Sequence, residues 1–145
     1  MTIRLFAATF AVAAALLAFN VVEVSAHGDV TPQPVDTTGL DPVGEEWRKH
    51  NPYRENAKAV EIGTSGYNQN CARCHGLEAI SGGLAPDLRL IEKGDAGDEW
   101  FIERIRHGAK KPDGTTMMPA FEGLISQEAM WAIRTYLESK YTANP

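Results

Sequence analysis

The chain is short, slightly acidic and of ordinary apolar content. It has 145 residues, of which 43% are hydrophobic and 23% are charged, and its formal net charge is −5. Because one domain typically takes ~100–200 residues, this length argues against a multidomain enzyme, and the apolar content argues against wholesale disorder. The negative charge argues against nucleic-acid binding, which usually needs a basic domain or stripe.

The N-terminus has the pattern of a secretory leader. Arg4 precedes an apolar run over residues 5–19, and small residues stand before the expected cleavage point. We predict that residues 1–26 are a signal peptide cleaved after Ala26, which places the mature protein in the bacterial periplasm. The alternative is an uncleaved anchor, but a bilayer span needs ~20 apolar residues and Asn20 interrupts this run. No membrane span is predicted after cleavage.

Residues 27–54 are rich in proline and glycine and lack a regular apolar period. This composition predicts an irregular N-terminal arm that precedes a single domain over residues 55–145. Trp47 and Tyr53 favour an arm that packs on the domain, because large aromatic side chains bury considerable area. An arm that hangs free is the alternative.

The first helix is predicted from residue 55 to about residue 70. Val60, Gly63 and Tyr67 recur there at helical intervals, and the alternation typical of a strand is absent.

The motif Cys71-Ala72-Arg73-Cys74-His75 follows at once and has the C-x-x-C-H pattern of c-type haem attachment. The spacing puts two thiols on one side of a turn, where they can form thioethers with the porphyrin vinyl groups, and His75 then becomes an axial ligand of the iron. An exported pair of cysteines would otherwise suggest a disulfide. A thioredoxin-like pair needs a preceding strand, and zinc needs more ligands. The motif therefore predicts one covalently attached haem c per chain.

A second helix is predicted to follow Asp98, which can act as its N-cap, and to end near Gly108. Phe101, Ile102 and Ile105 supply its apolar residues.

Four side chains downstream of the motif are candidates for the second axial position of the iron: His107, Met117, Met118 and Met130. We interpret His107 as a solvated helix end and Met130 as a core residue. Met117 and Met118 follow a proline- and glycine-containing run, residues 111–116, so a loop can carry them across the face opposite the histidine. We predict Met118 as the distal ligand, with Met117 as the alternative.

The last helix is predicted to begin after Ser126, its N-cap, with Glu128 in the first turn and an apolar stripe formed by Met130, Ile133 and Leu137. Three helices of this length bury only a small core, so the porphyrin should act as a central apolar layer.

With these features the chain resembles the class I cytochromes c, small periplasmic electron carriers. The resemblance implies an all-α fold of three main helices around one haem. It favours Met118 over Met117, because the ligand methionine of that family typically precedes proline. It also implies that the face of the first helix with Gly63 and Tyr67 packs against the last helix, which bears the pair Tyr136-Leu137.

The family also places a proline after the haem histidine, here Pro86, whose carbonyl accepts the ring N–H of His75. Such a bond orients the imidazole and raises its basicity as a ligand.

A closer resemblance is to the c-550 type, which accepts electrons from PQQ-dependent quinoprotein alcohol dehydrogenases. It rests on four segments: 27–32, 44–48, 67–70 and 127–134. The resemblance implies such a dehydrogenase as donor, a terminal oxidase or another cytochrome as acceptor, and a monomeric carrier.

Ligation by histidine and methionine leaves no open position on the iron, so it favours electron transfer over substrate or oxygen chemistry. We therefore predict an electron-transfer protein and no enzymatic activity. The alternatives are a haem-based ligand sensor or a small haem peroxidase, which need a displaceable distal ligand, and a permanent haem subunit of a larger dehydrogenase or oxidase complex. Four basic residues could steer docking or simply form a solvated surface: Arg104, Arg106, Lys110 and Lys111.

Overall fold

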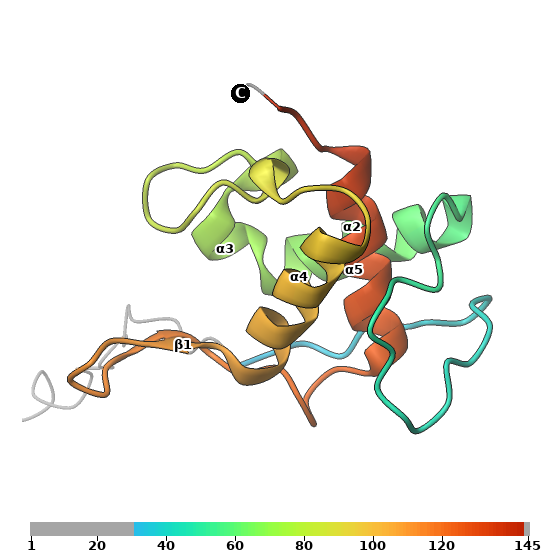
Figure 1. The fold of residues 1–145 in the computed structure, drawn as a ribbon, viewed down its shortest axis with the longest axis horizontal. Helices are drawn as coiled ribbons and strands as arrows, with labels where there is room; N and C mark the ends of the chain where they lie inside the picture. The colour runs from blue at the N-terminus through green and yellow to red at the C-terminus, as the bar shows by residue number, and fades with distance from the viewer. Residues whose placement is uncertain (1–30, 144–145) are drawn as a thin grey trace, which may run out of the picture.

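The computed structural model describes residues 31–143 and is mostly helical (Figure 1). Its longer helices are α2 (Ala57–Asn70), α4 (Asp95–His107) and α5 (Gln127–Ser139), and its short elements are α3 (Ala72–His75), η1 (Leu77–Ala79), η2 (Leu88–Leu90), β1 (Ala109–Lys110) and β2 (Thr116–Met118). The predicted fold of three main helices is confirmed. The predicted leader and its cleavage point at Ala26 lie outside the described residues.

The two strands form an antiparallel hairpin where the sequence predicted a flexible loop. Lys111 N–H donates to the Thr115 carbonyl, and Gly114 N–H donates to the Lys111 carbonyl, so the tip is a hydrogen-bonded turn. The hairpin projects to one side of the helices (Figure 1). Within residues 31–143, no helix is long and apolar enough to span a bilayer.

The close crossing of α2 and α5 forms the centre of the core. At Gly63 the backbones approach so closely that an added Cβ would lie 1.9 Å from the carbonyl oxygen of Ala132. One turn further along α2, the Tyr67 ring packs against Tyr136 with a centroid separation of 5.1 Å. This is the packing that the family resemblance implied.

Helices α2 and α5 each begin directly after a residue whose side chain caps the helix. Asn56 accepts hydrogen bonds from Lys58 N–H and Ala59 N–H, which sets the start of α2 just after the predicted residue 55. Ser126 accepts from Ala129 N–H, as predicted for the last helix. Burial of α5 extends well beyond the predicted apolar stripe and includes the side chain of Arg134.

The prediction of Asp98 as the N-cap of the second helix is wrong. Helix α4 begins at Asp95 with Gly94 as its N-cap, and Asp98 lies in the first turn with no exposed surface. Its carboxylate accepts a hydrogen bond of 2.8 Å from Arg134 Nε, which is also fully buried. An unpaired buried guanidinium would cost considerable folding free energy, so Asp98 pairs with Arg134 instead of capping the helix.

The N-terminal arm packs on the domain over the part that the structure describes. The Tyr53 side chain is buried, and its hydroxyl donates to the Asp41 carbonyl. The Trp47 ring lies 4.1 Å below the Arg106 guanidinium. Arg48 N–H donates to Gln127 Oε1 at 2.7 Å, which ties the arm to the start of α5. The proposed boundary at residue 54 stays a prediction.

We expect Gly63→Ala to lower the free energy of unfolding of the haem-loaded protein by about 3 kcal/mol, since overpacking of a close contact costs on the order of 1–3 kcal/mol and here the clash is with backbone. Chemical denaturation followed by circular dichroism checks this. Gly82→Ala is the matched control, because a Cβ there meets nothing within 4 Å. Equal stability of the two variants would contradict the packing at Gly63.

Candidate haem site

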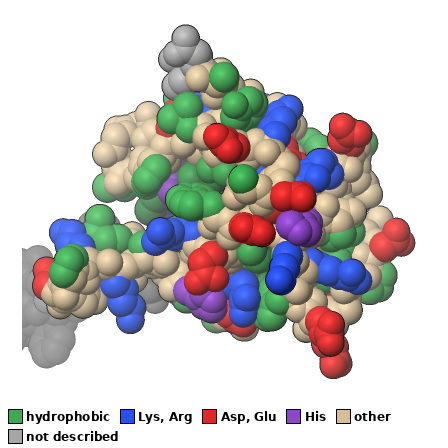
Figure 2. Space-filling model, in the orientation of Figure 1, with side chains coloured by type: hydrophobic (Ala, Val, Ile, Leu, Met, Phe, Trp, Pro, Cys, Tyr) green, Lys and Arg blue, Asp and Glu red, His purple; other side chains and the backbone are tan. Residues whose placement is uncertain are grey.

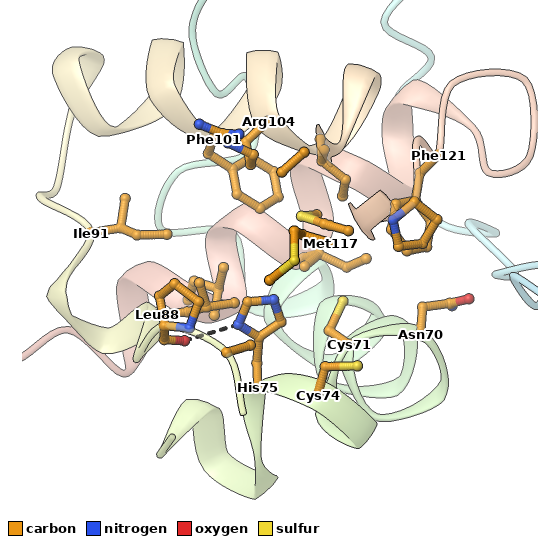
Figure 3. Close-up of a pocket in the computed structure, with 18 of the residues that line it drawn as sticks. Asn70, Cys71, Cys74, His75, Leu88, Ile91, Phe101, Arg104, Met117 and Phe121 are labelled. Atoms are coloured by element: carbon orange, nitrogen blue, oxygen red, sulfur yellow. Dashed lines mark hydrogen bonds between the residues drawn. The ribbon is translucent and has the colours of Figure 1, made fainter. Parts of the chain in front are cut away.

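A cavity of about 370 Å³ brings the predicted site residues together. Cys71, Cys74 and His75 line it from the segment after α2, and Phe101 lines it from α4. Met117 and Met118 line it from the hairpin. Figure 3 shows the labelled Cys71, Cys74 and His75 on one side of this cavity, with Phe101 and Met117 across from them.

The two cysteines occupy a single helical turn. Cys71 ends α2 and begins α3, and its carbonyl accepts from Cys74 N–H at 3.1 Å and from His75 N–H at 3.0 Å. The thiols are not joined in a disulfide. Burial, together with the nearby Cys74, raises the pKa of Cys71 to about 12. A redox-active C-x-x-C pair depends on a lowered thiol pKa, so this environment argues against thioredoxin-like chemistry.

The His75 ring is oriented by the chain itself. Its Nδ1 lies 2.9 Å from the carbonyl oxygen of Pro86. A carbonyl only accepts, so Nδ1 carries the hydrogen and the lone pair of Nε2 is left for a metal. The turn containing Pro86 is held in place by Asp87, whose carboxylate accepts from Arg89 and from Ser81 N–H.

The Gly76 backbone after the motif is also constrained. Gly76 has φ 81° and an added Cβ would lie 1.9 Å from the Ile80 carbonyl oxygen, so only glycine fits. The Tyr67 hydroxyl donates to the Gly76 carbonyl at 2.7 Å, which links this turn to the α2–α5 crossing. Tyr67, which packs α2 against α5, therefore also supports the turn that follows His75.

The two adjacent methionines differ in burial. Met117 is 59% exposed, whereas Met118 is partly buried and packs against the hydrophobic core. Met118 pairs with Ala109 across the hairpin. A Cβ at Gly108, at the end of α4, would lie 2.4 Å from the Met118 carbonyl oxygen, so α4 directly contacts the backbone of this methionine.

The other two candidates for the distal position lie elsewhere. His107 contacts Glu103 and Glu122, with nitrogen-to-oxygen separations of 3.6 Å, and it does not line the cavity. Met130 is fully buried in the core and does not line the cavity either.

Arg104 lines the cavity, whereas the sequence suggested for it only a role in docking or in the solvated surface. It lies one turn after Phe101, on the same face of α4, and its guanidinium is 5.6 Å from the Trp100 ring. Among the described residues no carboxylate forms an ion pair with it, whereas Arg106 pairs with Glu122 at 3.0 Å on another surface. The helical spacing from Phe101 is the signal that could have identified Arg104.

These residues fit a haem c. The cavity is mainly apolar, as a porphyrin requires, and it brings together two thiols, an imidazole with a free Nε2 and two thioether side chains. The guanidinium of Arg104 supplies a positive charge suited to the propionate groups of a haem.

The comparisons with known proteins agree with this site. The family described as "Cytochrome C oxidase, cbb3-type, subunit III" matches residues 58–137. A cytochrome c550 of Pseudomonas aeruginosa is 65% identical over 118 residues, which cover 79% of this chain and 81% of that protein.

Other relatives are larger proteins that match this chain over only part of their length. The quinohemoprotein alcohol dehydrogenase ADH IIB of Pseudomonas putida is 41% identical over 81 residues, which cover 56% of this chain and 11% of that protein. The cbb3-type cytochrome c oxidase subunit FixP of Rhizobium meliloti is 32% identical over 93 residues, which cover 56% of this chain and 30% of that protein. No solved structure matches the chain.

The cavity, the C-x-x-C-H turn and the similarity over most of the chain lead to one conclusion. The chain belongs to the cytochrome c family and, like a cytochrome c550, is a small electron-transfer protein that carries one covalently bound haem c.

Proposed function

We propose that the protein is a soluble periplasmic carrier that accepts electrons from a quinoprotein alcohol dehydrogenase and passes them to a terminal oxidase branch. In this proposal Cys71 and Cys74 hold the haem as thioethers, and His75 and Met118 are the axial ligands of the iron. The observation that carries it is that His75 and the methionines line the same apolar cavity, with His75 Nδ1 already bonded to the Pro86 carbonyl.

When bound, a haem c with these ligands supplies a one-electron couple whose potential methionine raises. The chain's own residues support that chemistry. Pro86 holds the tautomer of His75 in which Nε2 is free, so the ligand is ready without a proton shift. Phe101 and Phe121 line the cavity and limit the access of water. Arg104 would face the propionates and offset their charge.

Met118 suits the role of distal ligand better than Met117 does. Its partial burial and its packing against the core restrict the side chain, whereas Met117 is mostly exposed. A ligand that is already ordered loses less conformational entropy on binding the iron. Met118 also precedes Pro119, as the ligand methionine does in the family that the sequence resembles.

The donor is supported by similarity to quinohemoprotein alcohol dehydrogenases, two of which contain a segment similar to this chain. Transient redox complexes are typically small and electrostatically steered. Lys110 and Lys111 are exposed on the hairpin that carries the cavity residues Met117 and Met118, and they offer such steering. Figure 2 shows basic side chains on this projecting part of the surface.

The similarity to FixP favours a second candidate, a permanent haem subunit of an oxidase complex. Gel filtration separates the two candidates. A carrier should elute at the volume of a monomer, both from a native extract and from a micromolar mixture with purified dehydrogenase. A permanent subunit should elute together with its complex.

We expect Met118→Ala to remove the distal ligand. The ferric protein should lose its methionine charge-transfer band, and the ferrous protein should bind CO, because a coordination position becomes free. Visible spectra before and after CO addition check this. Met117→Ala is the matched control and should keep both the band and the resistance to CO. The reverse pattern would assign Met117, and CO binding by the unmodified protein would favour a sensor or peroxidase.

We expect the double variant Lys110→Glu, Lys111→Glu to be reduced more slowly by a PQQ-dependent ethanol dehydrogenase supplied with ethanol. The second-order rate constant should fall on the order of tenfold at low salt, and the difference should shrink as salt screens the charges. Stopped-flow absorbance measures both. The control is Lys49→Glu, Lys58→Glu, which makes the same charge change at exposed residues that do not line the cavity. Equal rates for the two double variants would rule out docking at the hairpin.

A further inference from the structure

A group of charged side chains is shielded from solvent where the N-terminal arm, α4 and α5 meet. Asp98 and Arg134 have no exposed side-chain surface, Glu138 is 8% exposed, and Arg54 from the arm is 38% exposed. Arg54 also lies 3.5 Å from the exposed Asp95, so three carboxylates face the two guanidiniums. Burial of charged groups is costly unless they are paired and hydrogen-bonded, and Arg134 Nη1 is buried without a hydrogen-bond partner among the described residues. The remaining pairs therefore matter to one another.

The arm supplies two of the three hydrogen bonds to the Asp98 carboxylate. Its Oδ1 accepts from Arg134 Nε at 2.8 Å, and its Oδ2 accepts from Arg54 Nη2 at 2.6 Å and from Asn51 N–H at 2.8 Å. Arg54 Nε also donates to Glu138 on α5 at 3.3 Å. Arg54 thus bridges the first turn of α4 to the last turns of α5. Both Arg54 and Asn51 precede residues 58–137, the part of the chain that the family matches.

The opposite end of α4 lies against the methionine segment. Phe121 N–H donates to the Ile105 carbonyl at 2.9 Å, and Gly108 contacts the backbone of Met118 so closely that no side chain fits there. Between its two ends α4 lines the haem cavity with Phe101 and Ile105. A helix of 13 residues transmits a displacement at one end to the other, because its backbone hydrogen bonds keep it stiff.

We propose that Arg54 is a positioning residue for the distal side of the haem: by anchoring the start of α4 it holds Met118 in place at the end. The inference rests on the proposed function, in which Met118 is the distal ligand. The arm, which precedes the residues that the family matches, would then help to keep other ligands away from the distal position of the iron. Without Arg54, Asp98 keeps Arg134 and the Asn51 N–H but loses its second guanidinium. Glu138 keeps the Gly94 N–H and a longer contact of 3.4 Å with Asn51 Nδ2, but loses its ion pair with the arm.

The test compares haem-loaded, full-length variants well below their unfolding temperatures. We expect Arg54→Gln to increase the apparent affinity of the ferrous protein for CO on the order of tenfold, because the fraction of molecules with Met118 displaced rises. Amide hydrogen exchange in α4 should become faster while exchange in α2 stays unchanged. Arg54→Lys keeps the charge but loses the planar fork, so it should give a smaller increase in CO affinity.

Lys58→Gln is the matched control, since it removes an exposed ion pair with Glu61 and should change neither measurement. If Arg54→Gln only lowers the unfolding temperature and leaves CO affinity and α4 exchange unchanged, Arg54 is merely structural and the inference is overturned. If Arg54→Gln does not fold, Arg54→Lys decides by the same two measurements. Met118→Ala separates the two proposals: if it fails to admit CO, the ligand assignment is wrong, whatever the Arg54 variants show.

Discussion

The close approach of α2 and α5 is the constraint on which the rest of the structure depends. It exists because Gly63 has no side chain where the Ala132 carbonyl passes. One turn further, Tyr67 packs on Tyr136, and its hydroxyl reaches the Gly76 carbonyl just after the haem motif. One helix crossing therefore sets the position of the cysteines and of His75 relative to the core.

The cavity is built around this crossing from elements with different roles. The segment after α2 supplies the thiols and the imidazole, α4 supplies aromatic and aliphatic lining with one guanidinium, and the hairpin supplies the methionines. A small chain buries limited apolar surface by itself, so a haem filling this cavity completes the core as well as the redox centre. We therefore expect cofactor binding and folding to be coupled.

The arm links a second set of interactions to this site. Its aromatic side chains pack on the domain, and its polar groups pair with the buried Asp98 and with the start of α5. Asp98 lies in the first turn of α4, whereas Phe101 and Ile105 line the haem cavity further along the same helix. Packing at the start of α4 can thereby affect the residues that its later turns and its end present to the cavity.

Local patterns in the sequence were sufficient for much of this description. The C-x-x-C-H motif, the helical spacing of Val60, Gly63 and Tyr67 and the cap at Ser126 each depend on residues within a few positions of one another, so they predicted haem attachment and the helices around it. Other features depend on long-range contacts. Asp98 looked like a cap but lies buried because Arg134, 36 residues away, needs its charge, and the partial burial that distinguishes Met118 from Met117 arises from the hairpin and the end of α4. No spacing along the chain reveals such pairings, because they form only when distant segments pack together.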